Sequence, residues 1–162
     1  MTVLALDLGT TTGWAYGADE RGLRCGFWRL KVGRYDTVSM RYVRFERHLD
    51  ELHKLVGFRH VVYEEVRKHR GTDAAHIYGG LQATLLRWCE TRGVPCEGVP
   101  VGTIKKHWTG KGNASKDHMR AAADERGYAH SGDENEIDAL ALAHWYVAEH
   151  QASSPEIEEL LK

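Results

Sequence analysis

Residues 2–9 read Thr2-Val3-Leu4-Ala5-Leu6-Asp7-Leu8-Gly9, an apolar stretch that is interrupted by a single carboxylate and ends at a glycine. The Val and Leu content, together with the stop at Gly9, predicts a buried β-strand. A charge in such a strand costs several kcal/mol unless it is paired or holds a metal ion. Asp7 therefore needs a functional or structural explanation more than any other residue, and Gly9 lets a backbone or a phosphate approach closely.

The rest of the chain predicts an α/β layer fold with a mixed sheet. The first strand and two further strands form an antiparallel meander, and helices then alternate with strands. The further expected strands are Trp14–Gly17, Leu23–Val32, His60–Tyr63 and Val94–Val99. The expected helices, from their apolar spacing and their Gly stops, are Met40–Val56, Asp73–Thr91, Gly102–Trp108, Ser115–Arg126 and Asp133–Glu149.

Length and composition favour one domain. The 162 residues are 42% hydrophobic and 28% charged, so we expect a domain over residues 1–150 and a tail over 151–162. No apolar run reaches the ~20 residues of a membrane span, and no basic leader precedes the first strand, so a cytoplasmic protein is expected. The three cysteines show no CxxC spacing, which argues against a disulfide framework and a zinc knuckle.

Charge is segregated along the chain even though the net charge is only −1. Residues 101–116 carry four lysines and no acid, and a second basic run follows residue 66, whereas residues 133–162 hold eight acids and one Lys. Such segregation can form a locally positive face that binds phosphate, although ordinary surface charge is the alternative. The basic residues concerned are Arg67, Lys68, Arg70, Lys105, Lys106, Lys111 and Lys116.

Two more carboxylates stand at the ends of apolar elements. Glu64 follows the strand Val61-Val62-Tyr63, and Asp138 lies in the first turns of the last helix. Together with Asp7 they offer only hard oxygen ligands, which suit Mg²⁺, with Mn²⁺ as a substitute, and two such ions can hydrolyse a phosphodiester.

Structural roles are the alternative for each acidic position. Asp7 could cap the turn at residues 9–11, and Glu64 could mark an exposed strand end. Asp133 and Glu136 could form a capping box at the start of the last helix.

These motifs, in order and at these spacings, resemble the RuvC-type Holliday junction resolvases of the ribonuclease H-like superfamily, particularly their phage-encoded relatives. The resemblance rests on Leu4–Gly9, Val62–Val66, Tyr78–Ala83, Ile104–Lys106 with Gly112–Lys116, and Asn135–Ala141. It implies a ribonuclease H-like fold: a mixed five-stranded sheet whose first three strands are antiparallel, with helices on both faces.

The resemblance also implies an activity: two-metal hydrolysis of four-way junctions and other branched DNA. Asp7, Glu64 and Asp138 would be catalytic and metal-binding, and Lys116 catalytic. Lys105 and Lys116 would contact DNA phosphates, and the remaining basic residues named above would add to the DNA-binding surface.

Two departures from the family pattern matter. The third carboxylate of the family, three residues before the last, is Asn135 here, so Asn135 or Glu134 would complete the metal site. The aromatic wedge that cellular resolvases carry three residues after the catalytic Glu is Arg67, which pairs with phosphate but inserts poorly between bases. We therefore expect a structure-selective nuclease with little sequence preference.

Symmetric resolution of a junction implies a homodimer, and the expected contact is the helix Asp73–Thr91 with its Gly79-Gly80 and Ala83. The alternative is a purely structural role, in which these small residues only pack against the sheet of their own subunit.

Two other functions fit parts of the sequence. Asp7–Thr12 is similar to the first phosphate loop of actin-like ATPases and sugar kinases, although 162 residues leave no room for their second domain. The other is a DNA-binding module of the same fold without catalysis. The three acids argue against it, because they would repel phosphate without a metal.

Overall fold

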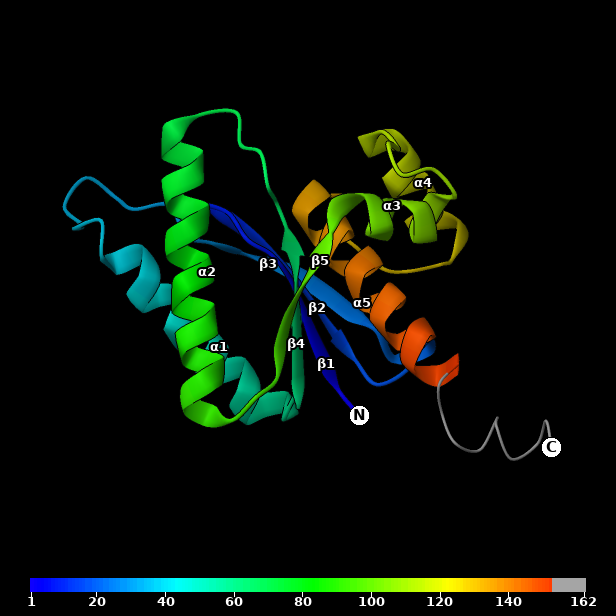
Figure 1. The fold of residues 1–162 in the computed structure, drawn as a ribbon, viewed down its shortest axis with the longest axis horizontal. Coiled ribbons are helices and arrows are strands. Elements are labelled where there is room, and N and C mark those ends of the chain that lie inside the picture. Colours follow the sequence, from blue (N-terminus) through cyan, green and yellow to red (C-terminus); the bar gives the residue numbers. More distant parts are fainter. Residues whose placement is uncertain (153–162) are drawn as a thin grey trace.

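The computed structural model describes residues 1–152, and they form a five-stranded sheet with the order β3-β2-β1-β4-β5 (Figure 1). The strands are β1 (Val3–Asp7), β2 (Thr11–Gly17), β3 (Arg24–Arg29), β4 (His60–Glu65) and β5 (Cys96–Pro100). β1, β2 and β3 are antiparallel neighbours, whereas β4 is parallel to β1 and β5 is parallel to β4. The predicted mixed sheet is confirmed.

Helices cover both faces of this sheet. Successive residues of a strand point to opposite faces, and the strands carry apolar side chains on both, so each face needs a covering layer. Leu4 and Leu6 of β1 pack in one core with Phe45 and Trp88, and Val3 and Ala5 belong to the other core. The first face carries α1 (Met40–Val56) and α2 (Thr72–Arg92); the second carries α3 (Val101–Thr109), α4 (Lys116–Glu125) and α5 (Glu134–Ala152).

Several boundaries differ from the sequence-based ones. β2 starts at Thr11 rather than Trp14, because Thr11 and Thr12 pair with the end of β3. β3 ends at Arg29 rather than Val32, and the next amide, that of Leu30, donates to Thr10 O at 2.7 Å. A short 3-10 helix, η1 (Glu20–Gly22), occupies the hairpin between β2 and β3.

The predicted tail begins inside the last helix. α5 runs to Ala152, two residues beyond the expected boundary at 150. The remainder of that tail, residues 153–162, lies outside the described residues. Among residues 1–152, no helix has both the length and the apolar content needed to cross a membrane.

Candidate metal centre

Asp7, Glu64 and Asp138 converge at one edge of the sheet. Each offers a carboxylate oxygen within 4.8 Å of the others. Leu6 pairs with Tyr63 in the parallel ladder, so the residues that follow them, Asp7 and Glu64, end neighbouring strands at the same edge. Asp138 reaches this edge from the second turn of α5. The three acids that the sequence singled out therefore form one cluster.

Gly13 brings α5 onto the sheet at this point. It is the partner of Asp7 in the antiparallel ladder, and a Cβ atom built on it would lie 1.8 Å from the backbone carbonyl oxygen of Asn135. Only a residue without a side chain lets the first turn of α5 lie directly on β2. Gly13 thus sets how closely Asp138 approaches Asp7.

The environment of the cluster opposes three negative charges. Burial and then the charges of Glu64 and Asp138 hold the pKa of Asp7 well above its ordinary value. Burial, followed by the charge of Asp138, raises the pKa of Glu64 to about 7, while Lys105 acts in the opposite direction. Burial raises the pKa of Asp138 to about 6, against Lys105.

A bound cation is the natural counterpart of such a cluster. A dication would favour the ionised carboxylates and relieve their repulsion. The donors are all oxygens, which matches Mg²⁺ or Mn²⁺ and not the thiolate and imidazole sets typical of zinc. On donor chemistry and electrostatics, the residues present fit the predicted metal.

The structural alternatives for Asp7 and Glu64 are not borne out. Thr12 closes the turn after β1: its hydroxyl donates to Gly9 O at 2.8 Å and accepts from Gly9 N–H at 3.4 Å. Asp7 is thus not needed to cap this turn. Glu64 is half-buried rather than an exposed strand end.

The capping-box interpretation is right for Asp133 and wrong for Glu136. Asp133 Oδ1 accepts from the amides of Asn135 and Glu136, at 2.9 and 3.3 Å. The Glu136 side chain is 3% exposed and turns away to accept from the amide and the hydroxyl of Ser131, and from Cys25. Because this carboxylate is buried against Ser131 and Cys25, it does not accept the hydrogen bond from the Asp133 amide that a capping box requires.

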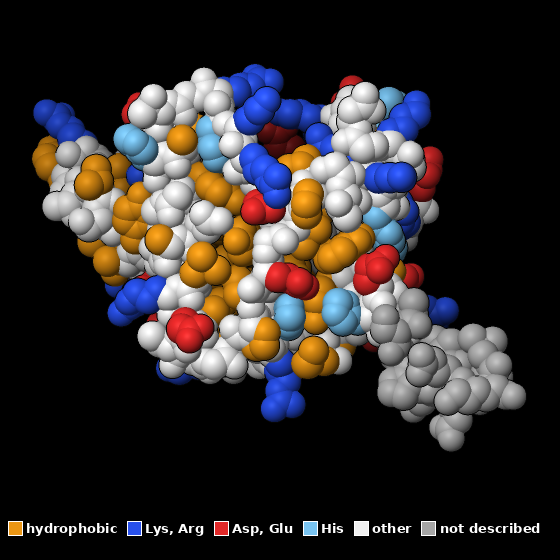
Figure 2. Space-filling view, viewed as in Figure 1, with side chains coloured by type: hydrophobic (Ala, Val, Ile, Leu, Met, Phe, Trp, Pro, Cys, Tyr) orange, Lys and Arg blue, Asp and Glu red, His pale blue; other side chains and the backbone are white. Residues whose placement is uncertain are grey.

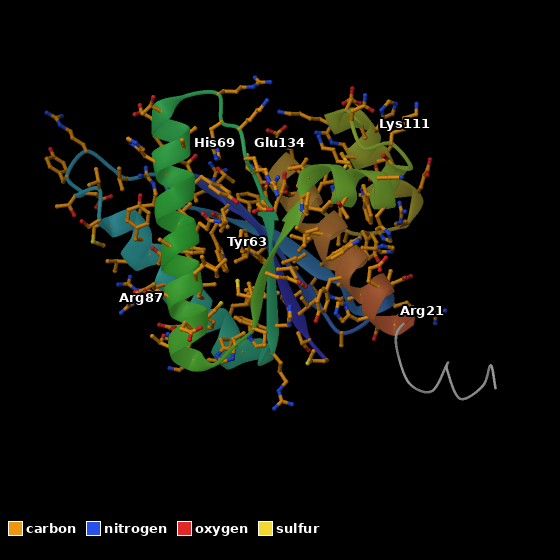
Figure 3. All side chains as sticks on the ribbon, in the orientation of Figure 1. Arg21, Tyr63, His69, Arg87, Lys111 and Glu134 are labelled. Carbon is orange, nitrogen blue, oxygen red and sulfur yellow. The ribbon has the colours of Figure 1, made fainter. Side chains whose placement is uncertain are left out.

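Glu134 lies on the cavity side of the cluster. It lines a small cavity of about 80 Å³ with Asp138, Lys105 and Lys116, and Lys116 Nζ lies 2.5 Å from its carboxylate. Its charge also raises the pKa of Asp7 and of Asp138. Figure 3 labels Glu134 at the upper edge of the sheet, beyond the end of β4.

Basic side chains surround the cluster. Figure 2 shows acidic side chains deep in a hollow flanked by Lys and Arg. Of the predicted DNA-binding residues, Lys105 and Lys116 line the 80 Å³ cavity, whereas Lys106 and Lys111 are exposed on α3 and the loop after it. The exposed Arg67, Lys68 and Arg70 follow β4, from the same sheet edge.

Two residues near the site were given no role from the sequence. Arg120 lines the cavity, and its position one helical turn after Lys116 was the available signal. Tyr78 of α2 fixes the end of β4: its hydroxyl donates to Glu64 O at 2.9 Å and accepts from Val66 N–H at 3.1 Å. Tyr78 thereby positions the backbone that carries Glu64, a role with no sequence signal.

Comparison with known proteins places this geometry on a known fold. No protein-family model and no curated protein matches the sequence. A Thermus thermophilus RuvC solved with a Holliday junction substrate is similar in structure, with a TM-score of 0.76 and 20% identity over 92% of this chain and 96% of that chain. Another Thermus thermophilus RuvC structure gives 0.73 and 22%, over 93% and 97%.

A more distant structure agrees with these two. The yeast mitochondrial Holliday junction resolvase matches with a TM-score of 0.63 and 14% identity, over 90% of this chain and 77% of that one. The sequence identity to all three structures is low, so the similarity lies in the arrangement of the sheet and helices. The chain has the ribonuclease H-like fold of the RuvC resolvases.

Proposed function

We propose that this protein is a metal-dependent, structure-selective endodeoxyribonuclease that hydrolyses phosphodiesters in four-way junctions and other branched DNA. The observation that carries the proposal is the cluster of Asp7, Glu64 and Asp138, with oxygens within 4.8 Å of one another, beside Lys105 and Lys116 on a RuvC fold. A carboxylate cluster beside basic side chains suits a ligand that brings both phosphate and metal.

We assign a separate role to each residue of the cluster and of its surroundings. Asp7, Glu64 and Asp138 would hold two Mg²⁺ ions, which when bound supply an activated hydroxide and stabilise the leaving oxygen. Glu134 is the better candidate than Asn135 for a fourth oxygen donor, because it lines the same cavity as Asp138. Lys116 would hold the flanking phosphate, once DNA replaces its present contact with Glu134.

Phosphate contacts would dominate recognition of the substrate. Arg67 is exposed and forms an ion pair with Glu65 at 3.8 Å, and because this pair is solvent-exposed, a phosphate could replace the Glu65 carboxylate at little cost. Contacts of this kind carry no sequence information. Without an aromatic wedge at this position, cleavage should extend to three-way junctions and forks, with little sequence preference.

A homodimer, matching the twofold symmetry of a junction, is part of the proposal. Five of the exposed residues of α2 lie along one stripe at heptad spacing, which is typical of helix pairing: His76, Gly79, Ala83, Leu86 and Glu90. Gly79 has open space around it, whereas Gly80 packs against Tyr42 of α1. Of the two glycines, only Gly79 is therefore available to a second copy.

The remaining parts of the proposal concern organisation. Residues 1–150 would form the nuclease domain, acting in the cytoplasm, or in that of a bacterial host if the gene is carried by a phage.

A cleavage panel tests this function. The purified protein is incubated with labelled four-way junctions, three-way junctions, forks, flaps and linear duplexes, each in several core sequences, with Mg²⁺, Mn²⁺ or EDTA. We expect metal-dependent incision of the branched substrates alone. Binding without incision would support a non-catalytic DNA-binding module instead. ATP hydrolysis in a parallel assay would support the actin-like alternative. Cleavage confined to one junction sequence would refute the predicted range of branched substrates.

A further inference from the structure

The loop between β3 and α1, residues 30–39, is a basic projection that the proposed metal centre does not use. β3 runs parallel to β1, so it ends at the sheet edge that carries Asp7, and the Leu30 amide donates to Thr10 O at 2.7 Å. Figure 1 shows the loop extending sideways from that edge, beyond α2, before the chain turns back into α1. It thus begins at the sheet edge that carries the metal centre and leads away from that centre.

The tip of this loop is held in shape by the protein itself. A turn closes where Asp36 N–H donates to Gly33 O at 3.1 Å, and Gly33 N–H donates to the Asp36 carboxylate at 2.7 Å. The same carboxylate accepts two hydrogen bonds from Arg44 of α1, at 2.7 and 2.9 Å. Arg34 and Tyr35 are therefore presented by a braced turn, with little ordering entropy left to lose on binding.

What the turn presents is positive charge and one aromatic ring. Tyr35 is 92% exposed, and the Arg34 guanidinium lies 5.7 Å from the centre of its ring. Lys31 and Arg29 are also exposed, and within the described residues 1–152 neither they nor Arg34 form an ion pair with a carboxylate. Figure 2 shows Lys or Arg above apolar side chains at this extremity.

The net charge of the loop and its flanking strand indicates which kind of ligand it would bind. Residues 24–39 hold four basic residues and one acid, a net charge of +3 in a chain whose net charge is −1. The one acid, Asp36, already serves Arg44. A positive, preformed projection on the edge that carries the nuclease centre is complementary to the sugar-phosphate backbone of DNA.

We propose that this loop, through Lys31, Arg34 and Tyr35, binds the backbone of a duplex arm at a distance from the incision site. The inference rests on the proposed function, since it takes branched DNA as the ligand. The two basic side chains would pair with phosphates, and the Tyr35 ring would pack on a sugar or offer its hydroxyl to a phosphate. The contact would stabilise junction binding without selecting a sequence.

Binding as a function of salt and arm length tests the proposal. In the Asp7→Asn background, which we expect to bind without cleaving, Lys31→Ala/Arg34→Ala should reduce the slope of log K against log salt by about 1.8 on a long-armed junction, at about 0.9 per phosphate contact. Tyr35→Ala should weaken binding several-fold. Both effects should disappear when the arms are shortened.

Matched controls separate the possible failures. Lys54→Ala/Arg59→Ala removes two exposed basic residues at the opposite edge of the sheet and should leave the slope unchanged. An unchanged slope in Lys31→Ala/Arg34→Ala, or equal losses on long and short arms, would overturn the loop proposal while junction cleavage by the unmodified protein stood. Absence of junction binding by the unmodified protein would refute both proposals.

Discussion

Gly13→Ala should disable the metal centre without touching a metal ligand. The added Cβ would lie 1.8 Å from the Asn135 carbonyl oxygen, and real Cβ atoms essentially never approach closer than 3.0 Å. The first turn of α5 must therefore retreat by at least about 1.2 Å, since the obstacle is backbone. Asp138 lies in the next turn and should move with it, away from Asp7.

The size of the effect follows from the tolerance of metal sites. Ligand distances in such sites hold to within about 0.2 Å, and a misplacement of about 1 Å can cost ~100-fold in rate. We expect Gly13→Ala to reduce junction cleavage about 100-fold and to weaken Mg²⁺ binding. It should also lower stability by about 1–3 kcal/mol through overpacking.

The assay compares single-turnover cleavage, Mg²⁺ titration calorimetry and thermal unfolding. Gly102→Ala is the control, because a Cβ there meets no atom within 4 Å, so it should cleave at the wild-type rate. Wild-type cleavage by a folded Gly13→Ala protein would refute the argument that this glycine sets the distance between α5 and β1.

Three further predictions follow from the same geometry. Lys116→Ala should slow cleavage and reduce the salt slope of DNA binding by about one phosphate contact, measured by filter binding; an unchanged slope would make Lys116 a solvated charge. Without metal, the raised pKa of Glu64, about 7, means that the folded state keeps a proton that the unfolded state loses, so stability falls as the pH rises from about 4.5 to 7. That loss is roughly 3 kcal/mol, and calorimetric melts should show Mg²⁺ reversing it at pH 8; a pH-independent melt in EDTA would contradict the burial argument. Ala83→Glu/Leu86→Glu should convert the expected dimer to a monomer by light scattering and uncouple the paired incisions, and a monomeric unmodified protein on DNA would refute the dimer.

The sequence was sufficient to predict the α/β layout of the fold and to single out three acids as candidate site residues. Asp7 stood out because a charge in a buried strand requires a reason, and Glu64 and Asp138 because they end apolar elements. Parallel neighbouring strands then make Asp7 and Glu64 meet at one edge, which is a consequence of topology alone. The local patterns can be read from one chain, whereas the strand order that brings these acids together was expected from the resemblance to the RuvC-type resolvases.

Details that depend on packing between distant segments were not predictable. The contact between Gly13 and Asn135 joins positions 122 residues apart, and nothing in either local sequence marks it. The Tyr78 hydroxyl reaches the end of β4 only because α2 packs on that face. Glu136 matched a local capping rule, but burial near Ser131 and Cys25 outweighed it.

The most direct test of the account is incision of a labelled four-way junction by the unmodified protein and by Asp7→Asn, each with Mg²⁺ and with EDTA. If these three carboxylates hold the catalytic metal, incision is expected only by the unmodified protein in Mg²⁺. Asp7→Asn should bind the junction at least as tightly, because it loses both a metal ligand and a charge that repels phosphate. Incision by Asp7→Asn at the unmodified rate, or incision that persists in EDTA, would contradict a metal centre built on Asp7, Glu64 and Asp138.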